Sequence, residues 1–241
     1  MPPVCILAGL GKSYRGKTVF TSLELTVDAG EVVAITGKSG SGKSTLLNIL
    51  GLLETFDQGN VTVFGQPLPP IRSAQATRLR RTKLGYLFQN YALVDNESLD
   101  YNLRLAQTYT KGSATSQREA RAAALTRVGL PDAGRRKVYE LSGGEQQRLA
   151  IGRLLLKPCQ LVLADEPTGS LDTSNRDAVL AMLQQLAAQG KTVILVTHDE
   201  HVARACDRVF SLPDPAPSMG VLPESTSPRS TKAPAGKSGN C

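Results

Sequence analysis

A glycine-rich segment near the start of the chain has the residue types and spacing of a phosphate-binding loop. It reads GKSGSGKST over residues 37–45 and fits the pattern G-x-x-x-x-G-K-[ST] without a mismatch. Glycines let backbone N–H groups wrap around a phosphate, and the N-terminus of a following helix adds partial positive charge. Such a loop is expected to bring Lys43 to the β- and γ-phosphates of a nucleotide and the Ser44 hydroxyl to Mg²⁺. The candidate nucleotide-binding residues are Gly37, Lys38, Ser39, Gly40, Ser41, Gly42, Lys43, Ser44 and Thr45.

The sequence on both sides of this loop favours phosphate binding over a turn that only caps a helix. An apolar run over residues 31–36 precedes the loop and predicts a buried strand, and residues 46–50 continue as a helix. Phosphate binding by this kind of loop requires that order of elements. The loop by itself leaves GTPases, kinases, helicases and transport ATPases open.

A second apolar strand, predicted over residues 161–165, ends in two acidic residues. Ligands of open α/β sheets bind at the carboxyl ends of the strands, so Asp165 is expected to hold Mg²⁺ through water. Glu166 points elsewhere from the next position and can orient or activate an attacking water molecule. Two solvated acids at the start of a turn are the alternative, because Pro167 and Gly169 follow. The phosphate loop makes the metal site the favoured interpretation.

Another glycine-rich helix start precedes this strand. Ser142 can cap the helix, and Glu145, three residues later, completes a capping box. Gly143 and Gly144 are poor helix formers, and their presence in the first turn is explained if bare N–H groups approach an anion. One chain is not expected to present both helix starts to the same nucleotide. Two chains arranged head to tail would let each helix complete the other chain's site.

At these motifs the sequence resembles the ATP-binding subunits of ATP-binding cassette (ABC) transporters, over about residues 4–212. The segment LSGGEQQR at 141–148 looks like the signature sequence that is specific to this family, and DEPT at 165–168 matches its Walker B region. Gly152 departs from the family, which commonly has alanine there. Further matches fall at the family's adenine-stacking aromatic, Q-loop glutamine, D-loop aspartate and switch histidine, which are Tyr14, Gln89, Asp172 and His198.

The resemblance implies a role for each residue that matches within one chain. Tyr14 would stack on adenine, with a tyrosine on a sheet surface as the alternative. Gln89 would contact Mg²⁺ and the attacking water, and the catalytic set would be Glu166, His198 and Gln89. His198 would bridge the γ-phosphate and Glu166. Each polar side chain alone would more often be structural, and their joint occurrence favours the catalytic interpretation.

The resemblance also implies a mechanism that needs two cassettes. Residues acting in trans on the opposite subunit's ATP would be Ser142, Gly143, Gly144 and Asp172. Two ATP molecules would be sandwiched in a homodimer, or in a dimer with a second cassette. Binding of ATP would close the dimer, and hydrolysis at Glu166 would open it. No apolar run approaches the ~20 residues of a membrane span, so a separate transmembrane permease subunit would supply the membrane domain.

The motif surroundings are similar to the group of ABC ATPases that exports lipoproteins, macrolides and antimicrobial peptides, and residues 87–98 are similar to bacteriocin-export ATPases. We therefore expect a cytoplasmic ATPase, peripheral on the inner face of the cell membrane, that drives export of a peptide, bacteriocin, lipoprotein or drug. An ABC ATPase that regulates a division- or cell-wall-associated membrane complex is the alternative. A nucleic-acid-associated ABC ATPase fits less well, because the stretch between Gln89 and Ser142 has no room for a long coiled coil.

An α/β fold must position these residues. Apolar runs at 31–36, 161–165 and 192–197 suit parallel strands that are covered on both faces. Apolar residues after Ser174 recur with helical spacing, and Gly190 ends that helix. The alternation of strands and helices predicts a P-loop NTPase (RecA-like) core with a parallel sheet.

Smaller units are predicted around this core. Residues 4–10 predict a buried first strand, and residues 18–27 and 60–64 predict short strands of an N-terminal antiparallel β-subdomain. An Ala-, Leu- and Arg-rich stretch at about 90–156 predicts an inserted α-helical subdomain, in which Ser116-Gln117-Arg118-Glu119 has a capping-box pattern. The ATP-binding domain would span 1–212, and the Pro-, Ser- and Lys-rich residues 213–241 would form a flexible tail.

The composition of the 241 residues limits the partners. A hydrophobic fraction of 41% with 20% charged residues is typical of a soluble globular protein. The net charge of +7 permits an anionic partner, but only 5% of the residues are aromatic and none is Trp, so no nucleic-acid partner is expected. The four cysteines have neither zinc-site nor disulfide spacing. Two basic clusters are interpreted as solvated helix faces, with a membrane surface or partner loops as the alternative: Arg78, Arg80, Arg81 and Lys83, then Arg135, Arg136 and Lys137.

Overall fold

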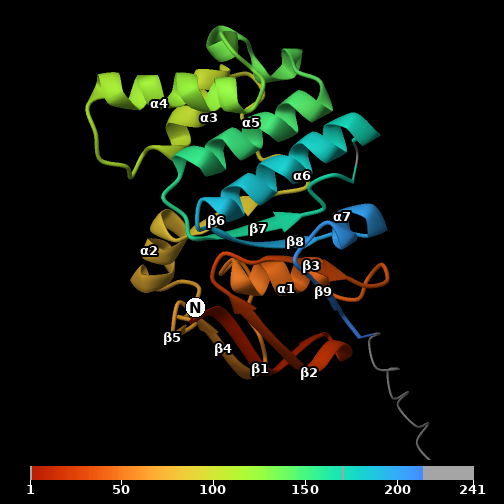
Figure 1. Ribbon diagram of the computed structural model, residues 1–241. Helices are drawn as coiled ribbons and strands as arrows, with labels where there is room; N and C mark the ends of the chain where they lie inside the picture. Colours follow the sequence, from red (N-terminus) through yellow and green to blue (C-terminus); the bar gives the residue numbers. More distant parts are fainter. Residues whose placement is uncertain (1, 170, 214–241) are drawn as a thin grey trace, which may run out of the picture.

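Two β-sheets and a group of helices form the structure (Figure 1), a computed structural model that describes residues 2–169 and 171–213. The antiparallel sheet lies at the bottom of the view, the parallel sheet in the middle and the helical region at the top. This arrangement confirms the predicted fold class. Of the predicted tail, 213–241, all but Pro213 lies outside the described residues, as does Ser170.

The parallel sheet contains the three strands that the apolar runs predicted. Its order is β6-β7-β8-β3-β9. The strands are β6 (Leu84–Leu87), β7 (Leu161–Asp165), β8 (Thr192–Val196), β3 (Val32–Thr36) and β9 (Arg208–Ser211). In the register, Val196 pairs with Asp165 on one side and with Ile35 on the other, so β7, β8 and β3 end at one edge. The sequence analysis did not predict β6 and β9, which are short strands of four residues each.

The antiparallel sheet differs in detail from the prediction. Its order is β2-β1-β4-β5, with β1 (Pro3–Tyr14), β2 (Lys17–Asp28), β4 (Gln58–Val63) and β5 (Gln66–Pro67). The strand predicted as short at 18–27 is not short, because β2 has 12 residues, as does β1. The first strand is also not buried throughout, since Leu7 is enclosed while Ile6 is 37% exposed. One face of this sheet packs on the core and the other meets solvent, which produces the alternation.

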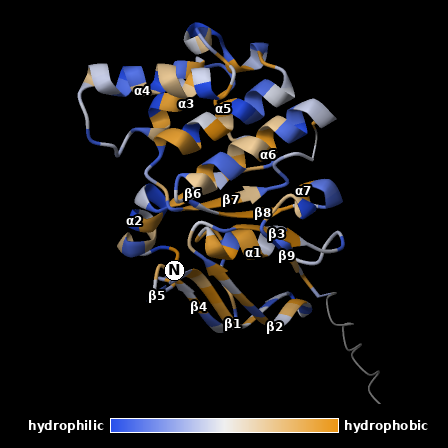
Figure 2. Cartoon of the chain, viewed as in Figure 1, coloured by the Kyte–Doolittle hydropathy of each residue, from blue (hydrophilic) through white to orange (hydrophobic). Residues whose placement is uncertain are grey.

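Helices fill the space between the sheets and cover the parallel sheet. The helix α1 (Lys43–Leu50) lies between the two sheets and buries Leu46, Leu47, Ile49 and Leu50. On the opposite face of the parallel sheet lie α5 (Gly143–Leu156) and α6 (Thr173–Ala188), as Figure 1 shows. The other described helices are α2 (Ala74–Thr82), α3 (Leu99–Ala106), α4 (Ala114–Arg127), α7 (Glu200–Arg204) and two short 3₁₀ helices, Ala133–Arg135 and Val138–Glu140. Figure 2 shows the hydrophobic residues concentrated in the strands and in α1, while α2 and α4 carry many hydrophilic residues.

The capping predictions had mixed outcomes. The capping box at the start of α5 is confirmed, with both the Ser142 and the Glu145 side chain hydrogen-bonded to backbone N–H groups. The one predicted at Ser116 is wrong, because Ser113 caps α4 and the Ser116 N–H donates to its hydroxyl at 3.1 Å. Ser113 is an equally good cap three residues earlier, and with it the helix gains almost one more turn.

Two further sequence features have a packing explanation. Gly152 lies in α5 against α3, and a Cβ there would be 3.2 Å from Leu103 Cδ2, so the glycine allows close approach of the helices. The described cysteines are free thiols, and burial raises the pKa of Cys5 to about 12, which makes it an unreactive core residue.

Within the described ranges, no helix combines the length and the apolar character that crossing a membrane demands.

Candidate active site

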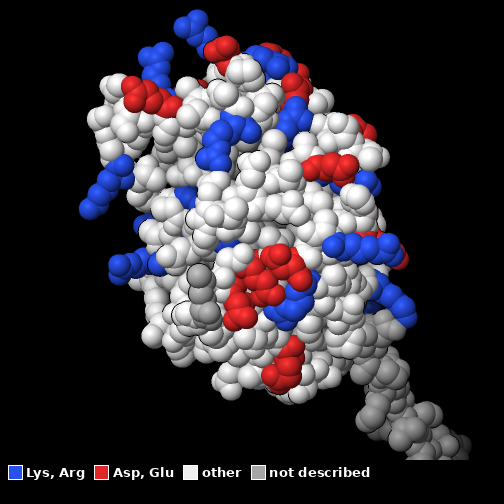
Figure 3. Space-filling model, in the orientation of Figure 1, with Lys and Arg blue, Asp and Glu red and all other residues white. Residues whose placement is uncertain are grey.

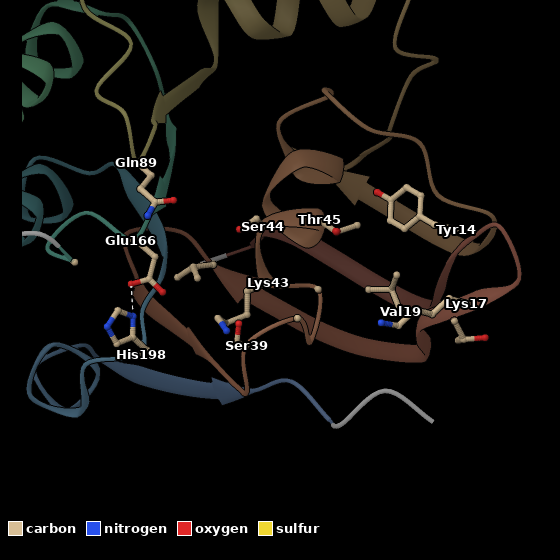
Figure 4. A pocket seen from close by; sticks show the side chains of 15 residues that line it. Tyr14, Lys17, Val19, Ser39, Lys43, Ser44, Thr45, Gln89, Glu166 and His198 are labelled. Carbon is tan, nitrogen blue, oxygen red and sulfur yellow. Dashed lines mark ion pairs between the residues drawn. The ribbon is translucent and has the colours of Figure 1, made fainter. Parts of the chain in front are cut away.

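A cleft of about 620 Å³ lies at the edge where β3, β7 and β8 end. Figure 4 shows Tyr14, Lys17 and Val19 on one side of the cleft and Gln89, Glu166 and His198 on the other. Between them lie the glycine-rich loop and the first turn of α1, including Ser39, Lys43, Ser44 and Thr45. The structure thus brings together the predicted residues that would act within one chain. Of the predicted residues, Gly37, Lys38, Ser41 and Asp165 do not line the cleft; Ser41 is buried, and Asp165 is joined to the cleft by its hydrogen bond from Ser44.

The loop can adopt its shape only because glycine occupies its last position before the helix. Gly42 is the N-cap of α1 and has a left-handed backbone with φ of 95°. A Cβ at Gly42 would lie 2.3 Å from Val19 Cγ1 of the neighbouring strand β2. Glycine is therefore required both for the backbone angle and for the space.

The ammonium group of Lys43 folds back over the loop. Its Nζ donates hydrogen bonds to the carbonyl oxygens of Gly37 at 2.8 Å and Lys38 at 2.9 Å. This holds a positive charge above the start of α1, where backbone N–H groups and the helix dipole also favour an anion. The three features together suit a phosphate group.

A hydroxyl and a carboxylate meet beside the lysine. Ser44 Oγ donates to Asp165 Oδ1 at 3.1 Å, across 121 positions of sequence. Burial raises the pKa of Asp165, and the negative charge of Glu166 raises it further, while the Ser44 hydrogen bond and Lys43 act in the opposite direction. A cation here would relieve the repulsion between the two carboxylates.

These oxygen ligands fit Mg²⁺, which prefers one or two carboxylates with phosphate oxygens and water. Among the described residues, no group of three or more His, Cys, Asp or Glu side chains could hold a metal ion. The protein part of a magnesium site would therefore consist of Ser44, Asp165 and the Gln89 amide, which lines the same cleft.

Glu166 and His198 form a close pair at the end of the cleft. Glu166 Oε2 lies 2.9 Å from His198 Nδ1, with the carboxylate side chain 16% exposed and the imidazole 68% exposed. Glu166 has a φ of 47°, which costs energy for a residue with a side chain. Its backbone N–H donates to Val196 O at 3.1 Å, which ties this strained residue to the neighbouring strand. The geometry suits a general base that a neighbouring imidazole orients.

Sequence analysis missed a residue beneath Tyr14. Tyr14 is 43% exposed at the end of β1, and Lys12 Nζ lies 4.8 Å from the centre of its ring. Lys12 is only 5% exposed and pairs with Glu54 at 3.1 Å and Asp57 at 3.6 Å. Burial lowers the pKa of Lys12, but the two carboxylates outweigh it, so the net pKa is raised and the cation persists. Its position two residues from Tyr14, on the same strand face, was the available signal.

The residues predicted to act in trans lie away from this cleft. Ser142 and Gly143 are exposed at the start of α5, and Asp172 is exposed as the N-cap of α6. Gly144 differs, because it is buried and a Cβ there would lie 2.7 Å from the Asn175 amide. The sequence analysis explained this glycine by an anion, whereas packing against Asn175 already requires it.

Comparison with known proteins identifies relatives for most of the chain. The family described as "ABC transporter" matches residues 20–169. The macrolide export ATP-binding/permease protein MacB 2 of Aeromonas hydrophila is 41% identical over 98% of this chain and 38% of its own length. The pyoverdine export ATP-binding/permease protein PvdT of Pseudomonas syringae is 39% identical over 95% of this chain and 36% of its own length. The chain thus spans a little over a third of these curated relatives.

Solved structures share the fold over nearly their whole length. A dimeric bacterial ABC transporter cassette, MJ0796, is 34% identical with a TM-score of 0.79, over 86% of this chain and 94% of that one. A dimeric post-hydrolysis state of the same cassette, bound to ADP and Pi, is 32% identical with a TM-score of 0.78 over the same shares.

Proposed function

Because this chain belongs to the ABC transporter family, we propose that it binds ATP with Mg²⁺ and hydrolyses the ATP to drive a membrane permease. One observation carries the proposal. The Glu166–His198 pair, at 2.9 Å, lines the same cleft as Lys43 and Ser44, and the Ser44 hydroxyl donates to Asp165 at 3.1 Å. A base, an anion site and ligands for a metal are what ATP hydrolysis needs in one place.

Each side chain of the site has a separate role in the proposed reaction. Lys43 would exchange its two carbonyl partners for phosphate oxygens, while Tyr14 stacks on adenine at the other end of the cleft. Ser44, Asp165 and Gln89 would hold Mg²⁺, which when bound neutralises phosphate charge. Glu166 would accept a proton from the attacking water, and His198 would hold that carboxylate in place. The exposed starts of α5 and α6 would complete the site of a second copy, which agrees with the dimeric cassettes among the solved relatives.

The names of the relatives indicate which kind of substance is transported. They describe export of macrolides and pyoverdine and join ATP-binding with permease in one protein. We propose that this chain powers export as well, of a drug, peptide, bacteriocin or lipoprotein, from the cytoplasmic side of a membrane. A membrane permease is the proposed partner of this chain.

A groove of about 400 Å³ between α2, α3, α5 and β6 is the proposed contact for the permease. Leu105 and Tyr109, two of the most exposed large hydrophobic side chains, line it at 43% and 54% exposure. Phe88 also lines the groove, and the next residue, Gln89, lines the cleft. A displacement of Phe88 by a bound permease can therefore be transmitted to the cleft. Exposed apolar side chains grouped in a groove are typical of a protein contact.

The substitution Leu105→Glu tests this contact. We expect the permease to stimulate ATP hydrolysis by the parent chain and to lose that effect on the variant, because a carboxylate would be desolvated in the contact. Phosphate release in proteoliposomes with the cognate permease measures it. The matched control is Leu53→Glu, since Leu53 is 45% exposed and does not line the groove. Equal stimulation of both variants by the permease would exclude the groove as the permease contact. Absence of any Mg²⁺-dependent ATP hydrolysis by the parent chain would exclude the proposed ATPase function.

A further inference from the structure

We infer that exposed arginines of and beside α2 bind the phosphate groups of anionic lipids, so that this face of the chain touches the membrane itself. We call Arg72, Arg78, Arg81 and Tyr109 the arginine surface. It lines a hollow of about 460 Å³ next to the groove assigned to the permease. The inference rests on the proposed function only in that the groove must then face the membrane.

The hollow and the groove form one continuous surface. Both are lined by Thr77, Arg81 and Tyr109. Among the described residues that line either of them, none is Asp or Glu, while the groove adds three more cations at Arg80, Arg153 and Lys157. Figure 3 shows the same separation, with Lys and Arg along the left edge over α2 and no Asp or Glu beside them on this face. The electrostatic potential over this surface is therefore positive, because no acidic side chain that lines it offsets the basic ones.

The arginine surface is also free to bind. Within the described part of the chain, the guanidinium groups of Arg72 and Arg78 make no hydrogen bond or ion pair, and both residues are exposed. Arg81 lies 4.5 Å above the Tyr109 ring, which leaves its N–H groups available. Arg80 differs, since it donates to the carbonyl oxygens of Leu52 and Ile71 and supports the fold.

The second basic cluster of the sequence has the opposite character. Arg136 pairs with Glu140 and Glu145. The hollow beside it, which Arg135 lines, contains Asp100 and Asp132 as well as Arg118 and Arg121, and Asp100 pairs with Arg121. Acidic side chains therefore lie among the basic ones at that cluster, and the structure distinguishes two clusters that look alike in the sequence.

Lipid phosphate is the anion that best fits the arginine surface. Guanidinium groups bind phosphate through two parallel N–H bonds, and tyrosine is enriched where proteins meet the lipid headgroup region. Each basic side chain near an anionic membrane adds to the attraction, which decays within a Debye length. A surface beside the groove for the permease would face the same membrane.

The test is vesicle flotation with the purified chain. The triple variant Arg72→Gln/Arg78→Gln/Arg81→Gln is compared with Arg118→Gln/Arg127→Gln/Arg135→Gln, which removes the same charge from exposed arginines elsewhere. We expect the parent to bind phosphatidylglycerol-containing vesicles and not pure phosphatidylcholine vesicles. The first variant should bind at least about tenfold more weakly, and the control variant about as well as the parent.

Three results would overturn the inference. One is equal loss in both triple variants, which would indicate net charge alone. Another is binding to phosphatidylglycerol that inorganic phosphate at millimolar concentration abolishes, which would indicate a free-phosphate site. The last is RNA binding that needs the same arginines. Because the assay contains no permease, its failure leaves the Leu105→Glu result unaffected, and the two proposals fail separately.

A different set of contacts carries a second inference, which rests on the proposed dimer. We propose that Asn175 is a positioning residue that holds the start of α5 and Asp172 in one arrangement. Its Nδ2 donates to Asp172 Oδ2 at 2.7 Å, and its Oδ1 accepts from Arg148 of α5. The same amide lies against Gly144, where no side chain fits. Asn175 thus touches both segments that would reach the partner's ATP.

The isosteric variant Asn175→Asp tests it by placing a second carboxylate against Asp172 while leaving Oδ1 for Arg148. In the Glu166→Gln background, we expect ATP-dependent dimerisation to weaken at least about tenfold, with the affinity of the monomer for ATP changed less than about twofold. A residue with only a structural role would change the melting temperature, the affinity of dimerisation and the affinity for ATP together. The control is Gln185→Glu, the same charge change at an exposed position of α6. Parent-like dimerisation of Asn175→Asp would reject the assignment.

Discussion

The variant Glu166→Gln is expected to lower ATP hydrolysis by at least about 100-fold and to accumulate an ATP-bound dimer. A positioned general base contributes roughly 10²–10⁴-fold to a rate, and an amide of the same shape cannot accept the proton. ATP binding should persist, because the phosphate loop and Lys43 are unchanged. The dimer would close on ATP and then fail to open, since only hydrolysis releases it.

The structure indicates that Glu166→Gln changes the side chain and leaves the backbone in place. The strained backbone of Glu166 is held by its N–H bond to Val196, which does not depend on the side chain. Phosphate release measures the rate, and light scattering after size exclusion with Mg-ATP measures the dimer. Glu200→Gln is a suitable control, because Glu200 is 82% exposed and pairs with Arg204 on the surface. If Glu166→Gln remained monomeric at saturating Mg-ATP, the two-cassette mechanism would have to be abandoned.

The second large effect is expected from Gly42→Ala, which should nearly abolish nucleotide binding. An added Cβ would overlap Val19 Cγ1 at 2.3 Å, and the φ of 95° would be strained as well. The matched comparison is Gly40→Ala, where φ is also positive, at 78°, but a Cβ would meet nothing within 4 Å. Strain from the backbone angle costs about 1–3 kcal/mol at either position, and overpacking adds about 1–3 kcal/mol at Gly42 alone.

The difference between the two variants isolates the contact between the loop and β2. The Kd for ATP should rise about fivefold to 150-fold more for Gly42→Ala than for Gly40→Ala, since each 1.4 kcal/mol is tenfold. Isothermal titration with Mg-ATP measures both, and thermal unfolding shows whether the core is intact. Comparable Kd values would mean that β2 yields to the new methyl group and that the loop is less constrained than its geometry indicates.

Local features of the sequence were sufficient for the main elements of this protein. The apolar runs at β3, β7 and β8, the loop before α1 and the capping box of α5 depend on neighbouring residues. Short-range sterics and hydrogen bonding determine such features, so they can be predicted without the tertiary structure. The wrong cap at Ser116 is also local, because Ser113 competed for the same role.

The resemblance to a known family implied the contact between Glu166 and His198, but other contacts between distant segments could not be predicted from the sequence. The Ser44–Asp165 bond spans 121 positions, and it depends on the register of a parallel sheet. The charge under Tyr14 depends on Glu54 and Asp57, which the connection between α1 and β4 brings to Lys12. The fit of Asn175 against Gly144 depends on how α6 packs on α5.

The sequence by itself determined that this protein has a phosphate loop, a carboxylate pair and a second glycine-rich helix start on an α/β frame. Those features need only the order and spacing of residue types along the chain. The tertiary structure alone decided which carboxylate accepts from the Ser44 hydroxyl, and which of two similar basic clusters remains uncompensated. Charges and hydrogen bonds act over a few ångströms in space, and sequence distance does not limit which groups folding brings within that range.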